Sequence, residues 1–89
     1  MKTYHFIVKG DVQGVGYRFT IFLHATRLKI TGTIKNLDNG DVEIYAQGTD
    51  NMISNLKHYL KIGSSSSHVT DISEDSLDEN PYKRFDIIY

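Results

Sequence analysis

The spacing of apolar residues changes at residues 10–16, and this change limits the folds that the chain can adopt. Before it, Tyr4, Phe6 and Val8 alternate with more polar positions, which is the period of a strand with one buried face. The stretch that follows, "GDVQGVGYRF", contains three glycines and one arginine. Apolar residues then recur every three or four positions, which predicts a helix over about 17–29. The residues expected on its buried face are Phe19, Phe22, Leu23, Thr26 and Ile30.

The next segment predicts a β-hairpin and a second helix. Asn39-Gly40 lies between two β-rich runs and is the commonest signal for a two-residue type I′ turn. Thr49 or Asp50 is a suitable N-cap for a helix that ends at Gly63. Its apolar residues at helical spacing are Met52, Ile53, Leu56, Tyr59 and Leu60.

Two strands are predicted after this helix, on either side of an acidic and polar stretch. "GSSSS" indicates a loop, and Val69 and Ile72 then indicate a short, bulged strand at an edge of the sheet. Phe85, Ile87 and Tyr89 alternate with other residues in a last strand. The order is β-α-β-β-α-β with one short extra edge strand. This order predicts an α+β, ferredoxin-like split βαβ sandwich, with both helices on one face of an antiparallel sheet.

Composition limits the partners of this fold. A chain of 89 residues is expected to form one domain over residues 1–89. No apolar run approaches the roughly 20 residues that cross a bilayer, and the first residues resemble no signal peptide, so we expect a cytoplasmic protein that binds no membrane. The net charge of −1 argues against nucleic-acid binding. Cysteine is absent, and the four histidines show no metal-ligand spacing.

The glycines between the first strand and the first helix favour an anion site. Glycine permits positive φ, so successive amides near Gly10, Gly14 and Gly16 can point at one spot, beside the positive end of the helix dipole. Arg18, in the first helical turn, adds a forked cationic donor that suits phosphate oxygens. A turn whose glycines only satisfy backbone geometry is the structural alternative. Neither the Gly-Lys-Ser/Thr nor the Gly-x-Gly-x-x-Gly phosphate loop fits, since Phe19 replaces the third glycine of the latter.

Two segments resemble the signatures of acylphosphatases: "VKGDVQGVGYR", and then "GTIKNLDNGDVEIYAQG". The resemblance covers nearly the whole chain and implies hydrolysis of acyl phosphates to a carboxylate and inorganic phosphate by a monomer without metal or cofactor. It implies that Arg18 binds phosphate and that Asn36 positions the attacking water. The chain departs from the family at Gly32-Thr33, where Gly-Trp is frequent, and at Gly63, which is followed by serines rather than proline. The residues whose amides would form the phosphate cradle are Gln13, Gly14, Val15, Gly16, Tyr17 and Arg18.

Strand parity supports the role of Asn36, because Asn36 lies on the same face as Ile34. If Ile34 packs under the helices, Asn36 faces the same side of the sheet. An isolated asparagine near a turn is more often a turn former. Two other function classes stay open at this point: a non-catalytic anion-binding module on the same fold, and an RNA-stacking sheet, although "DVEIYAQG" lacks the aromatic and basic motif of that class.

Overall fold

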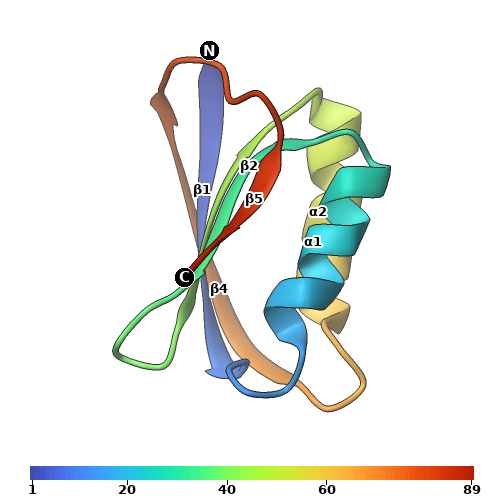
Figure 1. Cartoon of the computed structure of the whole chain (residues 1–89), viewed down its shortest axis with the longest axis vertical. Coiled ribbons are helices and arrows are strands. Elements are labelled where there is room, and N and C mark those ends of the chain that lie inside the picture. Colours follow the sequence, from blue (N-terminus) through green and yellow to red (C-terminus); the bar gives the residue numbers. More distant parts are fainter.

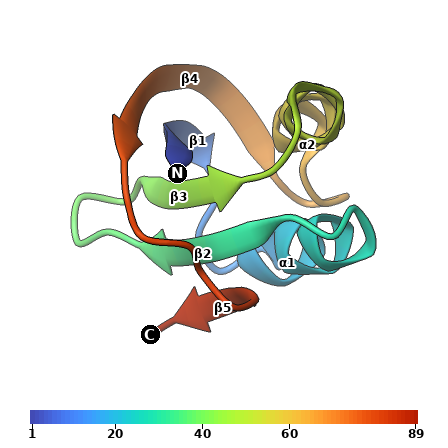
Figure 2. The ribbon, with the colours of Figure 1, turned by 90° about the horizontal axis from the view of Figure 1, so that it is seen from above.

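Five strands form one sheet, and two helices cover one of its faces. The structure, a computed structural model, describes residues 1–89. The strands lie in the order β4-β1-β3-β2-β5, and both helices lie on the same side (Figure 2). The predicted ferredoxin-like α+β fold is therefore confirmed. In chain order, the elements are β1 (Lys2–Asp11), α1 (Tyr17–Arg27), β2 (Thr31–Asn36), β3 (Val42–Gln47), α2 (Asp50–Ile62), β4 (His68–Asp78) and β5 (Phe85–Ile88) (Figure 1).

The two edge strands differ from the prediction. β4 is not short: it has 11 residues and pairs antiparallel with the whole of β1. The short extra strand is β5, of 4 residues, which pairs in parallel with β2, so the sheet is mixed rather than wholly antiparallel. The length of β4 escaped prediction because its backbone pairs with β1 while most of its side chains are exposed. Such a strand needs no apolar alternation.

Gly10 belongs to the sheet rather than to the anion loop. The pairing between β1 and β4 shifts register where Lys9 pairs with Asp71 and Gly10 pairs with Val69, so the extra residue, Thr70, lies in β4 and the predicted bulge of that strand is confirmed. Gly10 has a φ of 129°, and a Cβ there would lie 2.1 Å from the carbonyl oxygen of His68. Only glycine fits at this bulge.

The buried face of α1 is not the predicted one. Tyr17, Ile21 and Ala25 are buried, whereas Phe19 and Leu23 are exposed. Thr26 is also exposed, Phe22 is partly buried, and Ile30 is buried but lies beyond the end of the helix. The first turn sets the rotation of α1: its N-cap, Gly16, is left-handed, and the Tyr17 hydroxyl donates to the Leu60 carbonyl oxygen on α2 at 2.8 Å.

The second helix agrees with the prediction. Thr49 is its N-cap and accepts a hydrogen bond from the Met52 N–H at 3.2 Å, and Gly63 follows its last residue. Ile53, Leu56 and Leu60 are buried against the sheet. Neither helix has the length and apolar character that crossing a bilayer requires.

The β2–β3 hairpin forms as predicted, but with a different turn. A type I′ turn needs positive φ at both central residues, and Asn39 does not have it, whereas Gly40 has a φ of 97°. The Asn39 side chain instead accepts a hydrogen bond from the Asp41 N–H at 3.0 Å and donates to Asp41 Oδ2 at 3.2 Å. The Leu37 N–H donates to the Asp41 carbonyl oxygen, so residues 37–41 form a longer turn.

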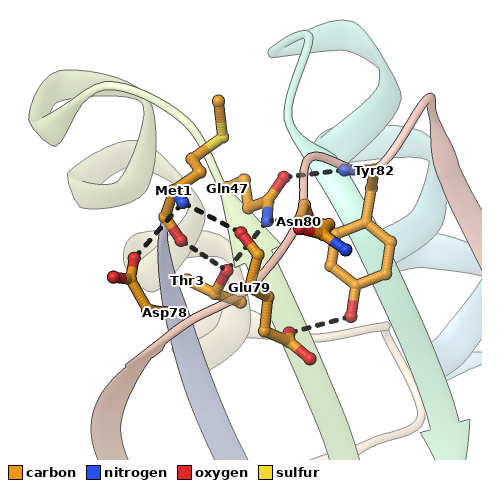
Figure 3. A network of polar contacts seen from close by, with 7 residues as sticks. All are labelled: Met1, Thr3, Gln47, Asp78, Glu79, Asn80 and Tyr82. Atoms are coloured by element: carbon orange, nitrogen blue, oxygen red, sulfur yellow. Dashed lines mark hydrogen bonds and ion pairs between the residues drawn. The ribbon is translucent and has the colours of Figure 1, made fainter.

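A polar network fixes the connection between β4 and β5 at the far end of the sheet (Figure 3). Gln47 lies at its centre and donates to Thr3 Oγ1 at 2.8 Å and to the Asn80 carbonyl oxygen at 3.0 Å. The N–H of Tyr82 donates to Gln47 Oε1, and the Tyr82 hydroxyl donates to Glu79. Partial burial and this contact with Glu79 raise the pKa of Tyr82 to about 12. The network holds the chain where it crosses to the far edge of the sheet and begins β5.

His5 joins three strands on the face of the sheet opposite the helices. Its ring bonds Glu43 of β3 through Nε2 at 2.8 Å and Asp75 of β4 through Nδ1 at 2.9 Å, and it stacks on Tyr45. Partial burial alone would lower the pKa of His5, but hydrogen bonds and charge attraction from the two carboxylates outweigh it, so the pKa is raised above 6.5.

We expect His5 to make folding stability depend on pH. Because the pKa of His5 is higher in the folded chain, its contribution is complete below the unfolded value of about 6.5 and is lost as pH rises through the folded value. Asp75 is largely exposed, so the contribution is at most about 1 kcal/mol. Urea unfolding of the parent and His5→Gln at about pH 5.5 and pH 8.5 measures it. The difference in free energy of unfolding between the parent and His5→Gln should shrink at the higher pH, and an equal difference at both pH values contradicts the prediction.

Candidate functional site

One cavity brings together the two residues for which the family resemblance implies a catalytic role. Its volume is about 190 Å³, and it lies where the loop after β1 meets the end of β2. Figure 1 shows that loop and the β2–β3 turn at the same end of the sheet, away from the N-terminus. Arg18 and Asn36 both line the cavity. The full lining is Val12, Gly14, Gly16, Tyr17, Arg18, Phe19, Asn36, Ile87 and Tyr89.

The loop offers a run of free backbone donors. None of the N–H groups from Val12 to Phe19 donates a hydrogen bond to a backbone carbonyl. Gly14 and Gly16 have φ values of 73° and 78°, and both line the cavity. Left-handed residues between right-handed ones turn successive N–H groups toward one side, and the last of these groups belong to the first turn of α1. This arrangement suits an anion.

Two residues of the predicted cradle do not line the cavity. Gln13 points its side chain at the β2–β3 turn, where Nε2 donates to the carbonyl oxygens of Leu37 at 2.7 Å and Asp41 at 2.8 Å. The Val15 carbonyl oxygen accepts a hydrogen bond from Ser64 Oγ at 2.7 Å. Gln13 therefore ties the loop to the turn that follows Asn36, and Ser64 ties it to the loop after α2.

The serine loop is more ordered than a flexible connection. Ser67 Oγ accepts a hydrogen bond from the Ser64 N–H at 2.8 Å and donates to the Ser64 carbonyl oxygen at 2.9 Å. Gly63 lies against the ring of Tyr17, and a Cβ there would lie 3.0 Å from it. Ser64, which follows Gly63 where proline is frequent in the family, thus bonds the anion loop directly, and Ser67 holds Ser64 in place.

The Arg18 side chain lies beside the C-terminal residues. Its Nη1 is 3.4 Å from the Ile88 carbonyl oxygen, and its guanidinium carbon is 5.0 Å from the centre of the Tyr89 ring. Neither contact includes a carboxylate, so no acidic side chain neutralises the guanidinium. The charge of Arg18 is available to an anion in the cavity.

Asn36 carries an unpaired acceptor. Its Oδ1 is buried and has no hydrogen-bond partner, and it is the one buried side-chain polar atom in the chain for which this is true. Ile34 is fully buried, so the parity argument correctly placed Asn36 on the helix side of the sheet. A buried polar atom without a partner is costly, and such atoms mark places where a ligand or water completes the bonding.

Tyr17 has no proton-transfer role in this geometry. Its ring is buried, and burial raises the pKa of its hydroxyl far above the ordinary value. The hydroxyl also points away from the cavity, to the Leu60 carbonyl oxygen. Tyr17 contributes its backbone N–H and the position of α1.

The family model for acylphosphatase matches residues 4–87. The chain belongs to the acylphosphatase family. The acylphosphatase of Bacillus subtilis is 42% identical over 90 residues, which cover 100% of this chain and 99% of that protein. A crystal structure of acylphosphatase from B. subtilis superposes with a TM-score of 0.95 at 41% identity, over the full length of both chains. An acylphosphatase structure from Coxiella burnetii has a TM-score of 0.91 at 32% identity and covers 97% of this chain and 90% of its own.

These relationships confirm the predicted family and the predicted acylphosphatase activity. They leave a non-catalytic anion-binding module and an RNA-binding sheet without support. The roles of individual residues stay predictions, although the structure places Arg18, Asn36 and the glycine loop around one cavity.

Four residues that line this cavity were missed, and one of them, Val12, directly precedes the predicted cradle. Phe19 was assigned to the buried face of α1, and Ile87 and Tyr89 were assigned only to a strand. The position of Phe19 could have been found, because a helix that begins at Tyr17 with Tyr17 buried must turn Arg18 and Phe19 outward. The position of Ile87 and Tyr89 depends on the parallel pairing of β5 with β2, for which the sequence carries no signal.

A wider hollow lies elsewhere and is unlike this site. It measures about 680 Å³ and is lined by Met1 and residues 78–82, around the network of Figure 3. Polar groups of its lining bond one another: the Met1 amino group pairs with Asp78, and the Tyr82 hydroxyl donates to Glu79. No group of three or more His, Cys, Asp or Glu side chains is arranged to hold a metal ion.

Proposed function

We propose that acyl phosphates are hydrolysed in the 190 Å³ cavity, with the backbone N–H groups and Arg18 holding the phosphoryl group and Asn36 holding the attacking water. One observation carries this proposal: the orphaned acceptor of Asn36 lies in the same cavity as Arg18 and the N-terminus of α1. A structural turn alone would leave neither the acceptor nor the donors unpaired.

The donors act on the charge of the phosphoryl oxygens. In phosphoryl transfer, charge spreads over three equatorial oxygens, so fixed donors that already point at them stabilise the transition state without reorganisation. The N–H groups of Gly14, Gly16 and Arg18 supply direction, and the Arg18 guanidinium supplies a full charge. Gln13 acts through its side chain, by keeping the turn after Asn36 in place.

Asn36 acts on the water. Oδ1 can accept a hydrogen bond from it, which leaves a lone pair of the water oxygen free to attack phosphorus. The water oxygen then forms a bond to phosphorus while the bond from phosphorus to the acyl oxygen breaks, and the carboxylate leaves with that electron pair. An amide is no base, so a phosphoryl oxygen takes the water proton. The products are a carboxylate and dihydrogen phosphate.

The proposal requires no metal ion, because a carboxylate is a good leaving group and positioning with charge stabilisation supplies the rest. Purified protein should hydrolyse benzoyl phosphate at the same rate with and without EDTA, measured by phosphate release. Activity that vanished with EDTA and returned with a divalent ion would contradict the metal-free mechanism. A single domain over residues 1–89, a monomeric state and a cytoplasmic location stay predictions.

A further inference from the structure

We propose that Phe19 and Tyr89 form an apolar rim that holds the acyl group of the substrate, so that the enzyme favours aromatic acyl phosphates over acetyl phosphate. The inference rests on the proposed cradle, since the rim has this use only if the phosphoryl group binds beside Arg18. It names a substrate class that the cradle alone does not determine.

The exposure of these two rings is the first support. Phe19 is 58% exposed and Tyr89 is 94% exposed. Both rings line the same cavity as Arg18 and Asn36. An exposed ring is common by itself, but two at the mouth of a catalytic cavity offer an apolar ligand surface that requires no movement of the core.

The size and polarity of the cavity are the second support. At about 190 Å³ it accommodates a phosphoryl group and its attacking water, so a larger acyl group must extend to the mouth. The inner donors are N–H groups and a guanidinium, which match the phosphoryl end. Apolar rings gain nothing from phosphoryl oxygens and match an apolar acyl group instead.

Arg18 links the two parts. The Tyr89 ring lies 5.0 Å from its guanidinium carbon, and Phe19 is the next residue in α1. An acyl group bonded to a phosphoryl group at Arg18 is therefore within reach of both residues. The methyl group of acetyl phosphate is too small to cover a ring, whereas the phenyl group of benzoyl phosphate can stack on one.

The test compares kcat/KM for benzoyl and acetyl phosphate in the parent and in Phe19→Ala. The ratio of the two values cancels any change in the phosphoryl site. We expect the ratio to fall roughly three- to tenfold in Phe19→Ala, which is the effect of one aromatic contact, with an unchanged inhibition constant for inorganic phosphate. Phe19→Leu, which keeps apolar surface but loses the ring, should fall between the two.

Ile62 supplies the matched control, because it is 59% exposed and does not line the cavity. Ile62→Ala should leave the ratio unchanged. An unchanged ratio in Phe19→Ala, or a parent that hydrolyses acetyl phosphate but not benzoyl phosphate, overturns the rim and leaves the cradle standing. A parent that hydrolyses neither substrate overturns the rim and the cradle together.

Discussion

Arg18→Ala is expected to lower kcat/KM for benzoyl phosphate by roughly a thousandfold, because it removes the only full charge that we assign to the phosphoryl group in the transition state. Ground-state binding should weaken as well. In the parent, phosphate should raise the melting temperature more than chloride at matched ionic strength, since a ligand of the folded state stabilises it by mass action. Arg18→Ala should lose most of this phosphate-specific increment.

Two further variants test whether the effect depends on the shape of the guanidinium group or only on positive charge. Arg18→Lys should recover little, since an ammonium group cannot reproduce the planar fork of donors. Arg27→Ala removes the same charge from the other end of α1, where the side chain is exposed, and should retain activity. If Arg27→Ala loses as much activity as Arg18→Ala, net charge and not a specific contact explains the loss. Equal melting shifts in phosphate and chloride would contradict the cradle itself.

Asn36→Ala is expected to lower kcat by roughly a hundredfold while phosphate affinity stays within a few fold, because the amide contacts the water rather than the phosphoryl oxygens. Its side chain makes no hydrogen bond through Oδ1 in the fold, so the variant should fold, as circular dichroism can verify. Steady-state kinetics with benzoyl phosphate and inhibition by phosphate give the two constants separately.

A second variant at Asn36 tests whether this residue contacts the water or the phosphoryl group. Asn36→Asp keeps an acceptor but adds a negative charge beside the phosphoryl group, so it should weaken phosphate binding as well as turnover. Asn55→Ala, an exposed position on α2, is the control for loss of an amide. A parent-like kcat in Asn36→Ala would remove the water-positioning role from Asn36, and equal losses of kcat and phosphate affinity would assign Asn36 to the phosphoryl group instead.

Local signals in the sequence were sufficient to predict the elements that they encode. Thr49 and Gly63 fix the ends of α2, and the alternation of Tyr4, Phe6 and Val8 identifies β1 and its buried face. The parity of Ile34 and Asn36 then placed Asn36 correctly. These predictions succeeded because a cap or a period of two residues depends on neighbours in the chain.

The wrong predictions concern features that depend on contacts between residues far apart in the sequence. The rotation of α1 depends on the hydrogen bond of Tyr17 to Leu60, which lies far along the chain. The length of β4 depends on backbone pairing with β1, to which exposed side chains contribute no pattern. The residues at 19, 22, 23 and 26 and those at 17, 21 and 25 each form a stripe along the helix, and periodicity alone could not show which stripe is buried.

The free N–H groups of the 12–16 loop determine which changes in sequence the site can tolerate. A ligand held by main-chain atoms contacts few of the side chains of those residues, so the side chains there serve the fold rather than recognition: Val12 is buried, and Gln13 bonds the β2–β3 turn. Recognition requires positive φ at Gly14 and Gly16, and any β-carbon at these positions disfavours the required backbone angles. The site therefore constrains the sequence of this loop through the backbone shape that the loop must keep.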